Sequence, residues 1–149
     1  MKILLDTNII LDVLQQREPW FDDGKAIFLS IAVKQHEGFI TAKQAADIHF
    51  FARRQFRGQD HVDEKARKIL SGLFILFDII DTLGEDCKNA FSFANNDYED
   101  AMLIASAVRS NVDCIITRNT DHFKGSPVRV FRPDEFLKSE GFTESITHD

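Results

Sequence analysis

Acidic side chains stand where the expected strands of this chain end. Asp6 directly follows the apolar run of residues 3–5, and Asp121 comes shortly after a second apolar run, residues 114–116. Asp97 and Asp100 open a helical segment. Taken singly, each carboxylate has a plain structural explanation, because acids cap helices, complement helix dipoles and form turns. The alternative is that these carboxylates together hold a cation.

A further acid, Asp47, lies inside an expected helix rather than at its start. Its helical neighbours at i+3 and i+4 are Phe50 and Phe51, so we expect its side chain to face an apolar surface. This is an unusual place for an aspartate. A pairing with Arg54, or simple solvation, is the ordinary alternative.

If three or four of these carboxylates converge, they need a cation. Two carboxylates about 4 Å apart repel each other by roughly 4 kcal/mol at an effective dielectric near 20. Such a cluster must therefore protonate or bind a cation. Oxygen ligands suit Mg²⁺ or Mn²⁺ rather than zinc, and the five histidines show no paired metal-binding spacing. An acid-bound divalent ion most often serves phosphate chemistry.

The elements that must position these acids alternate between strand and helix along the chain. Strands are expected at residues 2–6, 38–41, 77–80, 113–117 and 128–131, and helices at 8–16, 19–35, 42–56, 60–72, 83–93, 97–109 and 133–139. This alternation predicts a three-layer α/β/α fold with a central, mainly parallel sheet. Because ligands bind at the carboxyl ends of such strands, the acids that follow them are expected at one edge.

Composition places the chain among ordinary globular proteins. It has 149 residues, 44% hydrophobic and 28% charged, without repeats or linkers, so we expect one domain over residues 1–149. No apolar stretch has the length of a membrane span, and no signal-peptide layout opens the chain, so we expect a cytoplasmic protein. Cys87 and Cys114 are too few for a disulfide framework. The net charge of −6 does not exclude nucleic-acid binding, because basic residues can rim a local acidic site.

Five segments taken in order resemble the PIN domain family, the fold of VapC-type toxins. They are KILLDTNIILD, FITAKQAADIHFFARR, NNDYEDAMLIASA, IITRNTDHF and VFRPDEFL, and from the first to the last they extend over nearly the whole chain. The resemblance implies a metal-dependent ribonuclease that acts as the toxin of a toxin–antitoxin pair.

The resemblance also assigns the acids. It implies that Asp6 is the first metal-binding acid, that Asp47 stands where the family usually has Glu, and that Asp100, before an alanine, is the third. The fourth position matches Asn119, which is neutral where many relatives carry Asp. Asp47 is one methylene shorter than Glu, so its carboxylate must approach the metal differently or act through water.

The leading hypothesis is a ribonuclease that uses Mg²⁺ or Mn²⁺ to activate water. The expected catalytic residues are Asp6, Asp47, Asp100 and Asn119; the expected metal ligands are Asp6, Asp100, Asp97 and Asp121; and the expected orienting residues are Thr7, Asn8 and Thr117. Asp97 or Asp121 would supply the charge that Asn119 lacks.

Basic and aromatic residues suggest where partners bind. Arg53, Arg54, Arg118 and Lys124 are candidate contacts to the RNA backbone, and so is Arg57. The same cluster includes Lys65, Arg67 and Lys68, for which a solvated helix face is an equally good explanation. The resemblance implies a homodimer and a cognate antitoxin whose basic residue enters the acidic pocket. Candidate interface aromatics are Trp20, Phe21, Phe50, Phe51 and Phe56, for which core packing is the ordinary alternative.

Three other functions were weighed against this hypothesis. A phosphatase of the haloacid-dehalogenase type needs a second Asp two residues after the first, where this chain has Asn8. A response-regulator receiver needs an acidic pair and a late lysine that are not well placed here. A PIN domain that binds RNA or protein without cleaving stays open, because Asp47 and Asn119 depart from the family pattern.

Overall fold

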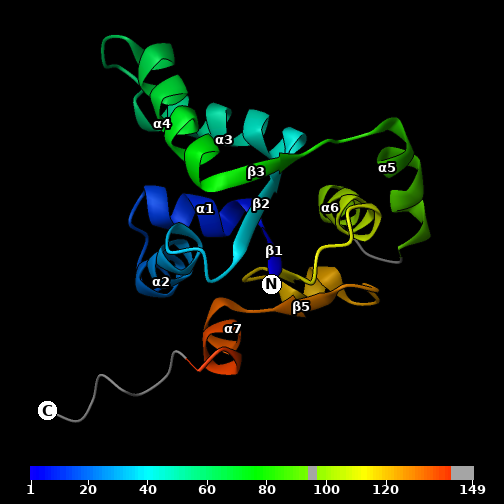
Figure 1. Ribbon diagram of the computed structural model, residues 1–149. Helices are drawn as coiled ribbons and strands as arrows, with labels where there is room; N and C mark the ends of the chain where they lie inside the picture. Colours follow the sequence, from blue (N-terminus) through cyan, green and yellow to red (C-terminus); the bar gives the residue numbers. More distant parts are fainter. Residues whose placement is uncertain (94–96, 142–149) are drawn as a thin grey trace, which may run out of the picture.

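The computed structural model describes residues 1–93 and 97–141, which form a five-stranded sheet covered by helices (Figure 1). The strands are β1 (Lys2–Leu5), β2 (Glu37–Thr41), β3 (Phe77–Ile80), β4 (Cys114–Ile116) and β5 (Arg129–Phe131). The α-helices are α1 (Thr7–Leu14), α2 (Phe21–Ala32), α3 (Ala42–Gln55), α4 (Val62–Leu76), α5 (Gly84–Asn89), α6 (Tyr98–Arg109) and α7 (Pro133–Ser139). Two 3₁₀-helices, η1 (Ala90–Ser92) and η2 (Thr120–Phe123), complete the description.

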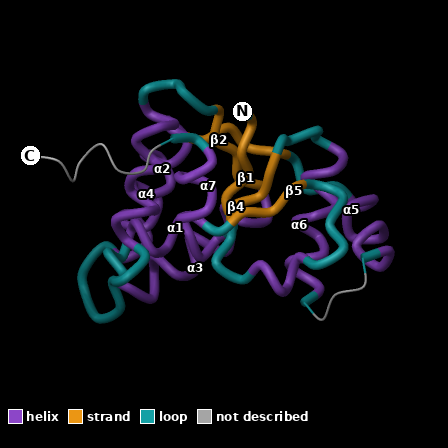
Figure 2. The backbone as a smooth tube through the Cα atoms, turned by 90° about the horizontal axis from the view of Figure 1, so that it is seen from below, coloured by secondary structure: helices purple, strands orange, loops and turns teal. Residues whose placement is uncertain are grey.

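The sheet has the order β3-β2-β1-β4-β5, and every strand pair in the described residues is parallel. Figure 2 shows the strands between two groups of helices, with α5 and α6 on one side and α1, α2, α3, α4 and α7 on the other. The predicted three-layer α/β/α fold with a mainly parallel sheet is therefore confirmed.

The central strand β1 shows why the sequence forms three layers. Ile3 and Leu5 belong to the core cluster under α1, α2, α3, α4 and α7, whereas Leu4 belongs to the cluster under α6. Successive side chains of a strand point to opposite faces, so a continuous apolar run requires cover on both. Asp6 is the first residue after this run, and its position at the strand end is fixed by that register.

Several predicted boundaries move when side chains pack. The helix expected over residues 83–93 is divided into α5 and η1, and the helix expected from residue 19 begins at Phe21. The helix expected to end at residue 72 continues to Leu76, because Leu73 is buried in the core and packing overrides the weak helix propensity of Gly72.

The buried carboxylate of Asp86 ties α5 to α6. It accepts hydrogen bonds from Arg109 Nε at 2.9 Å, from Ser106 Oγ at 2.9 Å and from the backbone N–H of Leu83 at 3.0 Å. Burial raises the pKa of Asp86, but these hydrogen bonds, led by those of Arg109, hold it below its ordinary value. This ion pair sets the position of α6, whose first turn carries Asp100.

A second buried ion pair joins the loop after β4 to α1. Arg118 Nε lies 2.7 Å from Asp12 Oδ2, and the guanidinium carbon lies 3.8 Å from the centroid of the Trp20 ring. Asp12 is 1% exposed, whereas its other cationic neighbour, Arg17, is partly exposed and lies 3.8 Å away. Arg118 therefore fixes the loop that carries Asn119.

None of the helices within residues 1–93 and 97–141 combines the length and apolar character that crossing a membrane requires.

Gly38 tests the packing of α2 on the sheet. A methyl group at this position would lie 2.7 Å from Ile31 Cδ1 and 2.8 Å from Phe77 Cδ1. We expect Gly38→Ala to lower the free energy of unfolding by about 1–3 kcal/mol in urea denaturation. The control is Gly72→Ala on α4, where nothing lies within 4 Å and a gain of up to about 1 kcal/mol is expected. Equal denaturation midpoints for the wild type and Gly38→Ala would contradict the predicted overpacking.

Removal of the Arg118 charge tests the second ion pair. Arg118→Met leaves a buried carboxylate uncompensated, so we expect a loss of about 3–5 kcal/mol in the free energy of unfolding. Burial already raises the pKa of Asp12 and Arg118 lowers it, so the variant raises this pKa further. An acid with a raised pKa destabilises the folded state as pH rises, and the loss is therefore expected to be greater at pH 8 than at pH 5.

Two variants serve as controls for this prediction. Arg17→Met removes only a partly exposed partner of the same carboxylate, and a change within about 1 kcal/mol is expected. The double variant Asp12→Asn with Arg118→Met is expected to recover part of the stability. A loss in Arg118→Met that does not depend on pH would show that packing on Trp20, rather than the charge, is what Arg118 contributes.

Candidate active site

A pocket of about 370 Å³ opens at the carboxyl ends of β1, β2 and β4. Its walls come from the starts of α1, α3 and α6 and from η2. Seven of the predicted site residues line it together: Asp6, Thr7, Asn8, Asp47, Asp97, Asp100 and Asn119. Residues as far apart in sequence as Asp6 and Asn119 thus meet because β1 and β4 are neighbours in the sheet.

Asp6 is buried at the floor of this pocket. It precedes α1, yet its side chain makes no capping hydrogen bond; instead its Oδ2 accepts one from Thr117 Oγ1 at 2.8 Å. Thr117 is held in turn by the backbone N–H of Asn119, which donates to Oγ1 at 3.0 Å. Burial raises the pKa of Asp6, and the bond from Thr117 opposes that rise. The Asp6 carboxylate is therefore held toward the pocket rather than used as a helix cap.

The first turn of α6 adds two carboxylates. Asp97 caps this helix by accepting a hydrogen bond from the backbone N–H of Asp100 at 3.0 Å. Burial, together with the nearby charges of Asp6 and Asp97, raises the pKa of Asp100 to about 6. The carboxylates of Asp6, Asp97 and Asp100 are thus close enough that Asp100 loses its proton less readily than a free aspartate.

His122, from η2, completes this group. Its Nδ1 lies 2.9 Å from Asp100 Oδ2 and 4.0 Å from Asp97 Oδ2. A carboxylate oxygen of Asp97, a carboxylate oxygen of Asp100 and a ring nitrogen of His122 all lie within 4.8 Å of one another. A donor set dominated by carboxylate oxygen fits Mg²⁺ or Mn²⁺, and the raised pKa of Asp100 is the response expected of carboxylates that lie close together.

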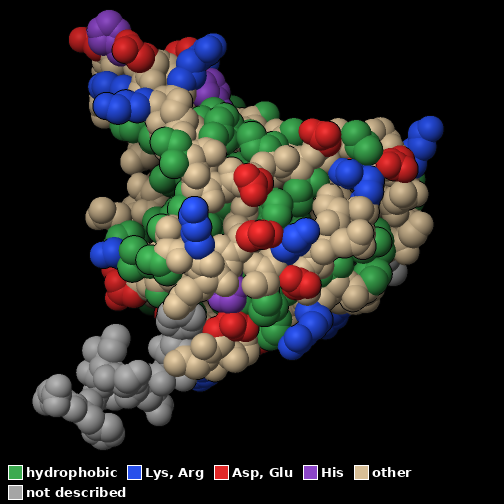
Figure 3. Space-filling view, viewed as in Figure 1, with side chains coloured by type: hydrophobic (Ala, Val, Ile, Leu, Met, Phe, Trp, Pro, Cys, Tyr) green, Lys and Arg blue, Asp and Glu red, His purple; other side chains and the backbone are tan. Residues whose placement is uncertain are grey.

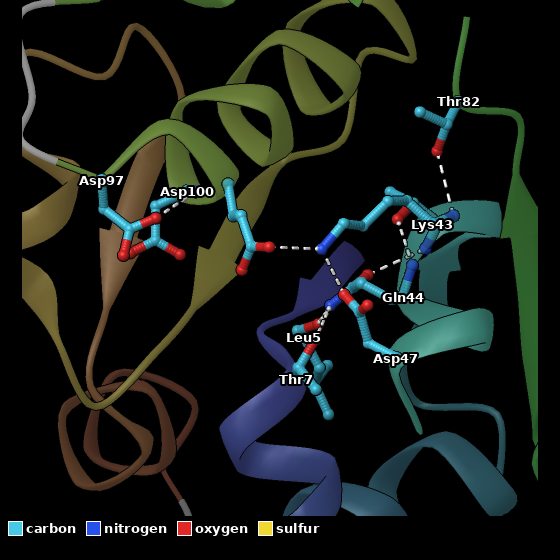
Figure 4. A network of polar contacts seen from close by, with 10 residues as sticks. Leu5, Thr7, Lys43, Gln44, Asp47, Thr82, Asp97 and Asp100 are labelled. Atoms are coloured by element: carbon cyan, nitrogen blue, oxygen red, sulfur yellow. Dashed lines mark hydrogen bonds and ion pairs between the residues drawn. The ribbon is translucent and has the colours of Figure 1, made fainter. Parts of the chain in front are cut away.

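Asp47 lies on the opposite wall with a partner of its own. Lys43 Nζ donates to Asp47 Oδ2 and lies 3.0 Å from Glu99 Oε1 (Figure 4). The partner is thus one turn earlier on α3, and not Arg54, whose guanidinium lies over the Phe50 ring. Asp47 lines the pocket and is about one-third exposed.

Gln44 holds α3 against the end of β1. Its Nε2 donates to the carbonyl of Leu5 at 2.8 Å and lies 3.2 Å from Thr7 Oγ1 (Figure 4). Gln44 also forms a capping box with Thr41, in which each side chain bonds the other residue's backbone N–H. Thr7 is thereby positioned by α3 as well as by its own helix.

The sequence led to no site role for four of the residues that line the pocket: Lys43, Gln44, Glu99 and His122. Lys43 and Gln44 carried a signal, since they lie between the end of an apolar strand and Asp47 on the same helix. His122 gave a weaker one, as the residue before Phe123, which is buried and anchors η2.

Asp121 and Lys124 are not among the side chains that line the pocket. The Asp121 side chain is 87% exposed and pairs with Lys124 at 3.6 Å. In the tight 3₁₀ turn η2, successive side chains are about 120° apart, so His122 faces α6 where Asp121 was expected. Thr117 likewise does not line the pocket, but it acts behind Asp6. Asn95 and Asn96, which open one of the quoted motifs, lie outside the described residues.

The predicted RNA contacts separate into two groups. Arg118 is bound to Asp12 and covers Trp20, so the structure gives it a partner within the protein. Arg53 and Arg54 lie in the last turn of α3. This end of the α3–α4 hairpin projects from the body, and basic side chains gather there with acids and histidine (Figures 1 and 3).

The aromatic residues suggested as interface contacts also differ in exposure. Phe50 is 56% exposed and packs edge-on against the half-buried Phe51, and both line the pocket. Trp20 is covered on one face by Arg118, and Phe56 lies beneath Lys65. Phe50 is therefore the most exposed of these aromatics at the pocket.

Comparison with known proteins agrees with this geometry. A family model described as a PIN domain matches residues 2–121. FitAcB from Neisseria gonorrhoeae has a TM-score of 0.68 and 21% identity, over 88% of this chain and 97% of that chain. A toxin–antitoxin complex from Klebsiella pneumoniae has a TM-score of 0.62 and 23% identity, over 88% and 97%. VapC20 from Mycobacterium tuberculosis, a sarcin–ricin-loop-cleaving toxin, has a TM-score of 0.58 and 13% identity, over 76% and 86%.

No curated protein matches the chain. The strand β5 and helix α7 lie beyond the residues matched by the family model, yet β5 pairs with β4 in the same sheet. Since the match spans most of the 149 residues and the fold is that of the solved structures, the chain belongs to the PIN domain family.

Proposed function

We propose that this protein is a metal-dependent endoribonuclease, the toxin of a toxin–antitoxin pair. The observation that carries the proposal is the convergence of Asp6, Asp97 and Asp100 in one pocket, where burial and mutual charge raise the pKa of Asp100 to about 6. Family membership and the structural likeness to toxin–antitoxin proteins support the same function.

The residues that would hold the ion are Asp6, Asp97 and Asp100, with His122 beside them. When bound, Mg²⁺ or Mn²⁺ would supply an activated water and neutralise charge on the scissile phosphate. Thr117 fixes the Asp6 carboxylate through its 2.8 Å hydrogen bond. Asn8 and Asn119 place neutral polar groups on the pocket wall, where they can orient water or a phosphate oxygen.

RNA is proposed to cross the pocket toward the basic end of α3. The start of this helix lines the pocket and its last turn carries Arg53 and Arg54, so one helix joins the acids to possible phosphate contacts. Contacts of this kind would make RNA binding depend on salt.

The proposed protein partners follow from the acidic pocket. A basic residue of a cognate antitoxin would find several carboxylates there, and the exposed Phe50 at the pocket offers an apolar contact. A homodimer is proposed by analogy with the family.

A PIN domain that binds RNA or protein without cleaving is the second candidate. One observation favours it: Lys43 already neutralises Asp47, the acid that stands at the second family position. The two candidates differ in whether metal supports cleavage.

Cleavage of a mixed RNA pool tests the main proposal. We expect purified protein to cleave RNA with Mn²⁺ but not with EDTA, and Asp100→Asn to reduce cleavage by at least about 10²-fold, because it removes a ligand of the proposed ion. Asp121→Asn is the matched control, since Asp121 is exposed and does not line the pocket. RNA binding without cleavage in any metal would instead support the second candidate.

The metal-free protein offers a test that does not need activity. Since burial and the charges of Asp6 and Asp97 raise the pKa of Asp100 from 3.8 to about 6, its ionisation opposes folding. Stability is therefore expected to fall as pH rises from about 4 to about 6 and then to level off. Asp100→Asn is expected to add on the order of 2 kcal/mol to the free energy of unfolding at pH 7.5, and little at pH 4.

Urea denaturation in EDTA at pH 4, 5 and 7.5 measures this difference, with Asp121→Asn as the control. If Asp100→Asn proved less stable than the wild type at pH 7.5, the carboxylate would instead be a stabilising group of the first helical turn, and the repulsion between the acids would be too weak to demand a cation.

A further inference from the structure

The charged groups of the pocket fall into two sets, and the Lys43 side chain reaches from the α3 wall to the α6 wall. Asp6, Asp97 and Asp100 form one set, beside His122. The other set, here called the Lys43 triad, consists of Lys43 and Asp47 from α3 and of Glu99 from α6. Figure 4 shows Lys43 extending from α3 into the space between the two walls, with Asp97 and Asp100 on the far side.

Lys43 is held in place by the fold and is not a loose surface side chain. The capping box of Thr41 and Gln44 fixes the first turn of α3, and the backbone N–H of Lys43 donates to Thr82 Oγ1 at 3.1 Å. The Lys43 side chain is 32% exposed, and two carboxylates bind its ammonium. Burial lowers the pKa of Lys43, but the hydrogen bonds to Asp47 and Glu99 raise it overall, so the group stays charged.

This position matters for the number of metal ions. A two-ion centre requires carboxylates that hold two divalent cations about 3.5–4 Å apart. In this pocket Asp47 of α3 and Glu99 of α6 already share the Lys43 ammonium. A divalent ion bound to Asp47 would approach that ammonium within a few ångströms, and the repulsion between the two cations would oppose its binding.

We propose that Lys43 is the built-in cation for Asp47 and Glu99, so that the pocket binds a single divalent ion at Asp6, Asp97 and Asp100. The inference rests on the proposed function and deepens it, because it sets the metal stoichiometry of the same site. Lys43 is thus a positioning residue: it holds Asp47 and Glu99 and takes the place of a second ion.

The test counts bound Mn²⁺ by isothermal titration calorimetry and by electron paramagnetic resonance of the free ion. The wild type is expected to bind about one ion per chain, and Lys43→Met about two, with the second ion bound at Asp47 and Glu99. Lys43→Arg keeps the charge and is expected to stay at about one. Lys65→Met, on α4 and paired with Gln59, is the control for loss of a lysine outside the pocket and is also expected to stay at one.

Thermal unfolding gives a second readout. Without metal, Lys43→Met leaves Asp47 and Glu99 unpaired, so saturating Mn²⁺ is expected to raise its Tm more than it raises that of the wild type. An equal rise in both proteins would count against the inference.

The outcomes separate the inference from the proposed function. Two ions in the wild type, or one in a folded Lys43→Met, would overturn the role of Lys43 while leaving a metal-dependent nuclease in place. No Mn²⁺ bound by any of the four proteins would overturn the inference together with the metal site on which it rests.

Discussion

Like-charge repulsion among carboxylates is the constraint on which the rest of this site depends. The parallel sheet places Asp6 at the end of its central strand, and α6 brings Asp97 and Asp100 to the same pocket. Burial and the charges of Asp6 and Asp97 raise the pKa of Asp100, so ionisation of this carboxyl group is unfavourable in the folded protein. The repulsion between these carboxylates can be relieved by a metal ion, by a basic side chain or by a proton.

The fold withstands this repulsion because its anchors lie behind the pocket. Asp86 with Arg109 fixes α6, Asp12 with Arg118 fixes the loop after β4, and Thr117 fixes Asp6. Each of the two ion pairs joins elements that are distant in sequence, and each is more buried than the pocket rim. The acids of the pocket can therefore face one another without setting the positions of their own helices.

The carboxylates of the pocket differ in whether a lysine of the protein pairs with them. On the α6 wall, Asp100 has His122 beside it, whereas Glu99 pairs with Lys43. The α3 wall supplies Lys43 from the preceding turn of the helix that carries Asp47. The short acid at position 47 is thus already paired with a lysine of its own helix.

The sequence by itself determined the layered parallel fold and most of the candidate site. Apolar runs at strand length, each followed by polar residues, placed Asp6 and Asn119 at one edge of a sheet, since register along a strand is a local property. Asp97 and Asp100 were expected at the start of a helix, where the structure has them. Tertiary structure alone decided which neighbours face these groups. That Arg118 turns to Asp12, that His122 rather than Asp121 meets Asp100, and that Lys43 lies between Asp47 and Glu99 all depend on contacts between distant elements. Spacing along a chain fixes the face on which a side chain lies, but only the packing of one element on another decides what stands opposite.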